Sequence, residues 1–335
     1  MKALATILLT FLVARVFAQS VFTVDNFSKD YYGKIQINDT SEVFSKGWIA
    51  IYDQKTNKQL IKVDADELAL DLHSGKALAN IKSLPYGEQS LIMYDDFNFD
   101  GEKDFAICDG QNSCYHGPSF KIYLSTPGGF LFSKEFTRLA QEYCGMFDVD
   151  AQEKKIHTMA KSGCCWHEYS EFIVENNKPR AIKIVTDQQD QVFSTTTEET
   201  WDGKKMVKKS TKTIDLSGVD VVLSFYVPEK EKQVVLFNVN DRLLYYALVR
   251  KDSTVEFSYP IEAVYQSPDF QFDSAARVMT VVFKNKGATY RIYERQKELG
   301  ITVTVDGKTF NWPGDTGTKK GSLKRLGELK LDNVY

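Results

Sequence analysis

One stretch of the chain, Asp96 to Asp104, has the residue types and spacing of a calcium-binding loop. Oxygen-bearing side chains occupy its positions 1, 3, 5 and 9, and Gly101 occupies position 6. Ca²⁺ is a hard cation that binds about six to eight oxygen atoms, so the backbone must curl around it. A glycine permits that turn and directs the next backbone carbonyl toward the ion. The pattern predicts a calcium site formed by Asp96, Asn98, Asp100, Glu102 and Asp104.

The residues around this loop distinguish it from an EF-hand. An EF-hand needs a bidentate glutamate at position 12, where this chain has Ile107. The flanking residues 91–94 and 105–107 are short apolar runs of strand length, without the long helical period of an EF-hand. We therefore expect the order strand, calcium loop, strand. The alternative is an acidic β-turn in which Asn and Asp serve the turn alone.

A second motif, Lys161 to His167, contains two adjacent cysteines. A cysteine nucleophile would need a helix after it and a histidine downstream. Residues 168–174 instead alternate like a strand, and His167 is the last histidine of the chain. A metal site of Cys164, Cys165, His157 and His167 is disfavoured, because adjacent thiolates rarely reach one tetrahedral ion and exported cysteines tend to oxidise.

The third interpretation of this motif is a rigid, disulfide-closed loop that binds a protein partner. Its contact residues would be Ser162, Gly163, Trp166 and His167. A braced loop binds without an ordering cost, and tryptophan is a preferred anchor of protein interfaces. A buried Cys-Cys-Trp cluster that holds the domain core is equally compatible with the sequence.

The sequence lacks the common enzyme templates. It has no Gly-x-Ser-x-Gly elbow, no P-loop, no His-Glu-x-x-His and no dinucleotide fingerprint. Carboxylates are plentiful, but nothing singles out one acid–base pair. His73 and His116 stand in turn-like polar contexts that are typical of surface residues. We therefore expect a protein that is not an enzyme.

The N-terminal residues predict export. Residues 1–18 combine a charged start, an apolar segment and an A-x-A-like site, which is the pattern of a cleaved secretory signal. A transmembrane anchor is the alternative, but the run is shorter than the ~20 residues needed to span a bilayer. Removing Lys2 and Arg15 from 42 basic residues leaves 40 against 45 acidic ones, a net charge of −5. The expected location is the periplasm or outside the cell, with no membrane anchor in the mature chain and no nucleic-acid partner.

The chain contains five cysteines, and an exported protein is expected to oxidise them. They are Cys108, Cys114, Cys144, Cys164 and Cys165. The connectivity cannot be deduced from sequence alone. The short separation favours a local bridge between Cys108 and Cys114, whereas Cys164 and Cys165 could form a vicinal ring or reach elsewhere. One thiol should remain.

Strand signals dominate the rest of the chain. Residues 48–63 predict a hairpin, and Asp202-Gly203 and Asp306-Gly307 predict two-residue turns. Residues 133–143 are the one plausible helix, with Ser133 as its cap. We predict a mostly β protein with two β-rich domains, residues 19–188 and 189–335, built from antiparallel sheets in a sandwich or barrel-like arrangement. The first domain would hold the calcium.

Two of these motifs together resemble an exported bacterial family of calcium-binding β-domains. They are residues 97–104 and Ser162-Gly163-Cys164-Cys165-Trp166-His167, and the resemblance covers about residues 45–185. The fold of that family is related to periplasmic inhibitors of invertebrate-type lysozyme. Those inhibitors insert a Ser-Gly-x-x-Tyr loop into the enzyme's active-site cleft. Ser162 and Gly163 match this loop, and Trp166 stands where the tyrosine is expected.

The combined expectation is an exported protein with a structural Ca²⁺ that binds a protein partner. The resemblance implies that this partner could be a lysozyme or another wall-degrading hydrolase. The alternatives are a cell-envelope hydrolase, and a structural or adhesion module of the envelope.

Overall fold

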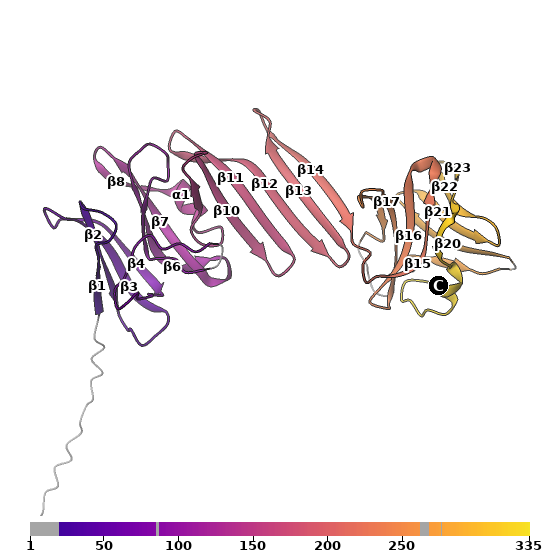
Figure 1. Ribbon diagram of the computed structural model, residues 1–335, viewed down its shortest axis with the longest axis horizontal. Coiled ribbons are helices and arrows are strands. Elements are labelled where there is room, and N and C mark those ends of the chain that lie inside the picture. The colour runs from indigo at the N-terminus through magenta and orange to yellow at the C-terminus, as the bar shows by residue number, and fades with distance from the viewer. Residues whose placement is uncertain (1–19, 85–86, 262–267, 276) are drawn as a thin grey trace, which may run out of the picture. The chain divides into compact units, whose positions relative to one another are not determined.

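The computed structural model describes residues 20–84, 87–261, 268–275 and 277–335 (Figure 1). The predicted signal peptide, residues 1–18, lies outside the described residues. The described chain forms five antiparallel sheets, and α1 (Lys134–Leu139) is its one α-helix. The predicted mostly β class with a single short helix is therefore confirmed.

The chain divides into two compact units. The first contains Met1–Ile184 and Glu199–Val207, and the second contains Val185–Glu198 and Lys208–Tyr335. The predicted domain boundary, between residues 188 and 189, falls inside one strand, β12 (Lys178–Asp190).

The first sheet of the first unit has four strands in the order β1-β2-β3-β4. They are β1 (Ser20–Val24), β2 (Tyr31–Ile37), β3 (Ser45–Asp53) and β4 (Gln59–Leu68). Side chains of a strand alternate between its two faces, so one face is apolar. Ile35, Ile49 and Val63 are cross-strand neighbours on that face and are buried. The pairing of β3 with β4 confirms the hairpin predicted for residues 48–63.

The second sheet contains the predicted calcium loop. Its strands follow the order β5-β6-β7-β8, and they are β5 (Ile92–Asp95), β6 (Asp104–Ser113), β7 (Gly117–Thr126) and β8 (Gly129–Ser133). The loop joins β5 to β6, which confirms the predicted order strand, loop, strand. Phe105 is fully buried, and its ring contacts Tyr31 of the first sheet and Phe130 of the second. The two sheets therefore share one hydrophobic core.

The helix of this unit follows β8 directly. The side chain of Ser133 accepts a hydrogen bond from the backbone N–H of Phe136 at 3.4 Å, so the predicted N-cap is confirmed. Phe136, Leu139 and Ala140 are buried. The helix ends at Leu139, four residues earlier than predicted, where Ala140 leaves the helical conformation.

The cap makes a testable contribution to stability. Ser133→Ala leaves an amide of the first turn without its side-chain partner, which costs about 1 kcal/mol. Urea unfolding followed by tryptophan fluorescence measures the loss, and Ser133→Thr keeps the hydroxyl as the matched control. Equal stability of the alanine variant and the wild type would show that the cap contributes nothing.

A six-stranded sheet follows in the order β14-β13-β12-β11-β10-β9. Its remaining strands are β9 (Asp148–Asp150), β10 (Lys155–Ser162), β11 (Trp166–Glu175), β13 (Phe193–Trp201) and β14 (Met206–Ile214). The cross-strand pair of Ile156 and Phe172 joins the core of the first unit. The β10–β11 hairpin is thereby fixed to the domain that contains the calcium loop.

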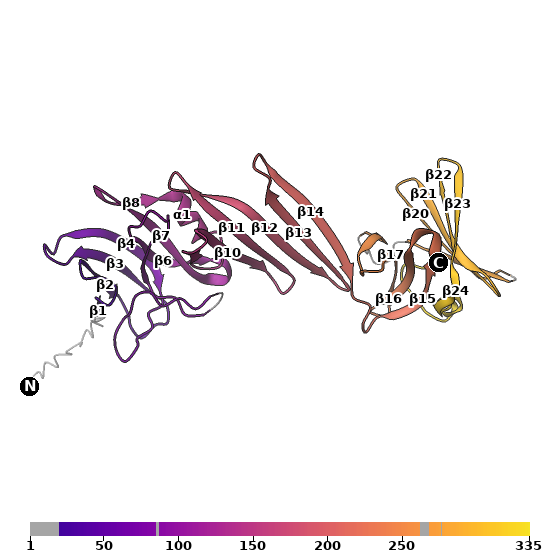
Figure 2. The ribbon, with the colours of Figure 1, turned by 45° about the horizontal axis from the view of Figure 1, so that its top comes forward.

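The second unit is built mainly from two five-stranded sheets, of which Figure 2 shows β20 to β23 side by side. One sheet has the order β18-β17-β16-β15-β24, with β15 (Asp220–Val227), β16 (Lys232–Val239), β17 (Leu243–Arg250), β18 (Val255–Tyr259) and β24 (Asp315–Gly321). The other has the order β19-β20-β21-β22-β23, with β19 (Gln271–Asp273), β20 (Val278–Asn285), β21 (Ala288–Arg295), β22 (Leu299–Val305) and β23 (Lys308–Pro313). Apolar side chains of both sheets form one shared core, as in a sandwich.

The two predicted two-residue turns have different outcomes. Asp306-Gly307 joins β22 to β23 with both residues at positive φ, 49° and 73°, and this prediction is confirmed. The prediction for Asp202-Gly203 is wrong, because β13 and β14 are joined by the four residues 202–205. The reason is that the Asp202 carboxylate accepts the amides of Lys204 and Lys205 at 2.8 and 2.9 Å, which stabilises a wider turn.

Candidate calcium loop and hairpin tip

The predicted calcium loop curls around its own acidic side chains. The carboxylate of Asp96 accepts the backbone N–H groups of Asp100 at 3.2 Å and Gly101 at 2.9 Å. The carboxylate of Asp100 accepts the amide of Glu102 at 2.8 Å. Gly101 has a φ of 94°, a conformation that L side chains rarely adopt, so the predicted need for glycine at this position is met.

Asp104 connects this loop to both neighbouring strands. It is fully buried at the start of β6, and it accepts the amides of Phe97 at 2.8 Å and Ser125 at 2.7 Å. Burial raises the pKa of its carboxyl to about 7, and the negative charges of Asp100 and Asp96 act in the same direction. A buried carboxylate with acidic neighbours is electrostatically unfavourable unless positive charge compensates it.

The donor types of the loop fit a hard cation. The carboxylates of Asp96, Asp100 and Asp104 have lone pairs beyond those that accept amide hydrogens, and oxygen is the ligand that Ca²⁺ requires. The side chains do not converge as a metal cluster, since the described residues contain no group of three or more His, Cys, Asp or Glu arranged to hold an ion. The Asn98 amide donates to Asp100 at 2.8 Å, and the Glu102 side chain is exposed. The calcium site therefore stays a prediction.

The second candidate site is the tip of the β10–β11 hairpin. The last cross-strand pair is Ser162 with Trp166, so three residues form the turn: Gly163, Cys164 and Cys165. The two cysteines are joined by a disulfide, which confirms that they can form a vicinal ring. Gly163 has a φ of 62° and no atoms near the position of a Cβ, so the backbone conformation is what favours glycine there.

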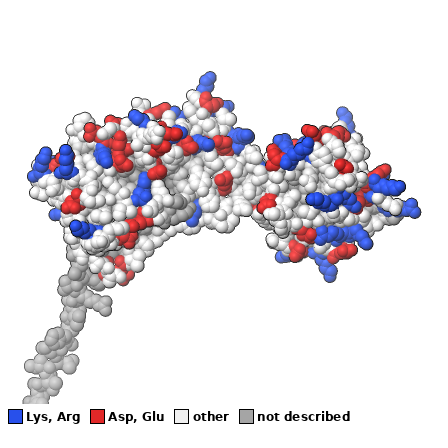
Figure 3. All heavy atoms as spheres, viewed as in Figure 1, with Lys and Arg blue, Asp and Glu red and all other residues white. Residues whose placement is uncertain are grey.

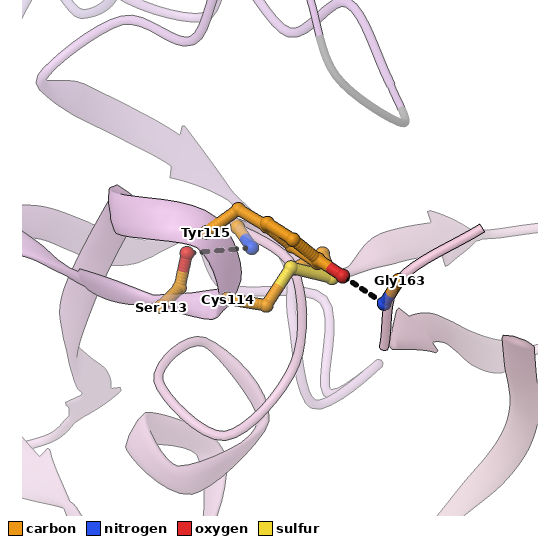
Figure 4. The surroundings of a disulfide bond; sticks show 6 residues. Ser113, Cys114, Tyr115 and Gly163 are labelled. Atoms are coloured by element: carbon orange, nitrogen blue, oxygen red, sulfur yellow. Dashed lines mark hydrogen bonds between the residues drawn. A yellow bond between two sulfur atoms is a disulfide. The ribbon is translucent and has the colours of Figure 1, made fainter. Parts of the chain in front are cut away.

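This tip is tied to a second disulfide through one tyrosine (Figure 4). The backbone N–H of Gly163 donates to the hydroxyl of Tyr115. Tyr115 lies between the strands β6 and β7 in η1 (Cys114–His116), next to the disulfide that joins Cys114 to Cys144. The Lys161 ammonium lies 4.7 Å from the centre of the Tyr115 ring. Tyr115 therefore contacts the hairpin at two places, the backbone of Gly163 at the tip and the side chain of Lys161 on β10.

The side chains of the predicted contact loop are accessible to solvent. Ser162, Gly163 and Cys164 are exposed, and Cys165, Trp166 and His167 are half-buried. The alternative of a buried Cys-Cys-Trp core cluster is therefore wrong. The His167 ring is nearly parallel to the Tyr169 ring, with an angle of 11° between their planes.

The predicted bridge between Cys108 and Cys114 is wrong. Six residue-to-residue steps of mostly extended chain place the Cα atoms of these cysteines about 20 Å apart, whereas disulfide Cα atoms lie within about 7 Å. Cys114 pairs with Cys144 instead, at a Cα–Cα distance of 4.8 Å. Cys108 is the free thiol, which confirms that one remains. Burial raises the pKa of this thiol to about 12, so it is unreactive.

Two neighbours of these sites, Tyr115 and Asn177, were not predicted from the sequence. Tyr115 lies 48 residues before Gly163, and no local pattern links the two. The Asn177 side chain accepts a hydrogen bond from the Asn98 amide at 3.1 Å, across 79 residues. Asn176 and Asn177 both have positive φ, and this adjacent pair after an alternating run is a turn signal that sequence reading can find.

Acidic and basic side chains intermingle on the face of the molecule shown in Figure 3. No helix in the part of the chain that the structure describes is long and apolar enough to cross a membrane.

No family model matches the chain, and no curated protein matches it significantly. Among solved structures, a Xanthomonas protein related to a Type IV secretion system is 18% identical over 58% of this chain and 96% of its own, with a TM-score of 0.46. A putative 6-phosphogluconolactonase from Bacteroides uniformis is 7% identical over 90% and 85%, with a TM-score of 0.23. The periplasmic gluconolactonase of Pseudomonas aeruginosa is 10% identical over 88% and 86%, with a TM-score of 0.24. At these TM-scores the similarities carry no conclusion about function.

Proposed function

We propose that this chain is an exported, non-enzymatic binding protein that contacts a protein partner through the tip of the β10–β11 hairpin. The observation that carries the proposal is the construction of the tip. A vicinal disulfide closes its turn, and the Tyr115 hydroxyl binds its backbone at Gly163. An exposed turn that is already ordered loses little conformational entropy when it binds, so more of the contact energy appears as affinity.

The proposal includes a structural Ca²⁺ in the loop of residues 96–104. The loop joins β5 to β6, and its buried Asp104 carboxylate also binds the backbone of β7 through Ser125. A cation there would be held by Asp96, Asn98, Asp100 and Asp104, with the backbone carbonyl of Glu102. It would offset the negative charge around Asp104 and stabilise the domain that carries the hairpin.

The two disulfides support export. Structural disulfides form and persist mainly in oxidising compartments, such as the bacterial periplasm and the extracellular medium. Millimolar calcium outside the cytosol would also suit a site with few carboxylates.

Within this class, we propose a lysozyme-type hydrolase as the partner, which the protein would inhibit. The support is the exposed Ser162-Gly163 pair at the tip, followed by the aromatic Trp166. A tip of this shape could enter an active-site cleft, with Trp166 as the anchoring side chain.

Lysis assays with lysozymes of the invertebrate, chicken and goose types test this proposal. The expected result is inhibition of at least one type as the protein is titrated. Trp166→Ala should weaken that inhibition about 30-fold or more, the effect of an interface anchor worth about 2 kcal/mol.

Trp48→Ala is the matched control, because Trp48 is a half-buried tryptophan on a different sheet of the same unit. The control should inhibit like the wild type. Absence of inhibition of every lysozyme type would reject the inhibitor proposal, and equal loss in both variants would reject the hairpin tip as the contact.

A further inference from the structure

An apolar groove lies beside the β10–β11 hairpin. It has a volume of about 300 Å³, close to the lower end of the range for small-molecule sites. Its lining combines apolar residues, among them Leu84, Tyr143, Met146, Met159 and Tyr169, with polar ones such as Asp148 and Thr158. Leu84 and Tyr169 remain 37% and 49% exposed, so apolar surface is kept in contact with water here.

The wall formed by residues 144–146 is held by hydrogen bonds on three sides. The amide of Cys144 donates to the carbonyl of Met159 at 2.8 Å, and the amide of Gly145 donates to Ser113 Oγ at 3.1 Å. The amide of Met146 donates to Gln89 Oε1 at 2.9 Å. The disulfide from Cys144 to Cys114 adds a covalent tie. This part of the groove is therefore formed before any ligand arrives.

The charged groups at the edge of the groove neutralise one another. Asp148 lies opposite His157 across the β9–β10 pair. Its carboxylate accepts a hydrogen bond from Lys82 Nζ at 2.9 Å, and the same ammonium donates to the carbonyl of Phe147 at 3.2 Å. The charges of Lys82 and Asp148 cancel, so an uncharged apolar group is the chemistry that fits.

We propose that this groove binds an uncharged aromatic group, namely a side chain of the protein that contacts the hairpin tip. Thioether sulfur makes favourable contacts with ring edges, and tyrosine rings pack against other rings in offset or edge-on geometries. The groove thus offers both kinds of contact through Met146, Met159, Tyr143 and Tyr169.

The position of the groove indicates the source of that side chain. Met159 lies three residues before Ser162 on β10, about 10 Å along the strand from the tip. Tyr169, its cross-strand partner, lies three residues after Trp166. A protein docked on the tip and extending along the hairpin would reach the groove. This assignment of the source rests on the proposed function, whereas aromatic binding by the groove does not.

Titration with the dye 8-anilinonaphthalene-1-sulfonate tests the groove, because its fluorescence rises at exposed apolar surface. The expected result is saturable binding of one dye per chain, and competition by N-acetyl-tryptophanamide. Met159→Glu places a negative charge in the groove, where it repels the sulfonate of the dye, and should weaken dye binding about tenfold or more. Tyr169→Ser should also weaken dye binding, and this substitution leaves the core intact because Tyr169 is exposed.

Val43→Glu is the matched control, because Val43 is exposed and lines a second apolar depression of about 310 Å³ in the same unit. The proposal is overturned if Val43→Glu removes dye binding while Met159→Glu does not, or if no saturable binding occurs. Failure of N-acetyl-tryptophanamide to displace the dye also overturns it, and displacement by decanoate alone would assign the groove to an alkyl chain. The lysis assays probe the tip separately, so either proposal can fail without the other.

Discussion

Addition of calcium to the metal-free protein is expected to raise the melting temperature of the first unit, and EDTA is expected to reverse the change. A ligand that binds only the folded state stabilises it by about 2.7 kcal/mol when its free concentration is about 100 times Kd. For a domain of about 150–250 residues this corresponds to about 5–10 °C. The physical source is the compensation of the acidic residues around Asp104. Calorimetric scans with calcium and with EDTA measure the difference.

Variants of the loop test whether the rise in melting temperature depends on residues 96–104. The double variant Asp96→Ala, Asp100→Ala should melt at the same temperature with calcium and with EDTA. Asp53→Ala is the control, because Asp53 also accepts backbone amides in a turn, from Lys55 and Thr56, but lies on the β3–β4 hairpin. That variant should keep the calcium effect. If neither calcium nor EDTA changes the melting temperature of the wild type, the loop serves only as a turn.

The two disulfides are expected to differ strongly in what they contribute to stability. The bond between Cys114 and Cys144 closes a loop with a sequence separation of 30, and the chain-entropy relation assigns about 3–4 kcal/mol to a loop of that size. The bond between Cys164 and Cys165 joins neighbours and restricts the unfolded chain far less, by about 1 kcal/mol. Cys114→Ser with Cys144→Ser should therefore lower the free energy of unfolding much more than Cys164→Ser with Cys165→Ser.

Urea unfolding followed by tryptophan fluorescence reports this difference, since Trp48, Trp166 and Trp201 all belong to the first unit. For partner binding, the order of the two double variants should be reversed. Loss of the vicinal disulfide should weaken partner binding, because the turn is then no longer closed by a covalent bond. Equal destabilisation by the two double variants would contradict the assignment of the first disulfide to stability and the second to the tip.

Local patterns were sufficient to predict the fold class, the strands on both sides of the loop at residues 96–104, and the second strand of the β10–β11 hairpin. Short apolar runs predicted the strands around residues 96–104, and the serine at 133 predicted the start of the helix. These features depend on a few neighbouring residues, so their physical causes are visible in the sequence. The same is true of Asp306-Gly307, where the turn type follows from the two residues that adopt positive φ.

The errors arise where distant segments meet. The proximity of Cys108 and Cys114 in sequence suggested a bridge, but a strand holds them apart and the partner of Cys114 comes from the segment after the helix. The Tyr115 hydrogen bond to Gly163 and the groove beside Met159 likewise depend on tertiary packing. At Asp202 the Asp-Gly pattern was present, but the Asp202 carboxylate accepts two backbone amides. These hydrogen bonds stabilise a wider turn.

The most direct test of the calcium site is a calorimetric titration of chelator-treated protein with calcium chloride. We expect one bound ion per chain in the wild type and in Asp53→Ala, and none in the Asp96→Ala, Asp100→Ala variant. Absence of binding by the wild type at millimolar calcium, or an unchanged stoichiometry in the loop variant, would show that residues 96–104 do not form a calcium site.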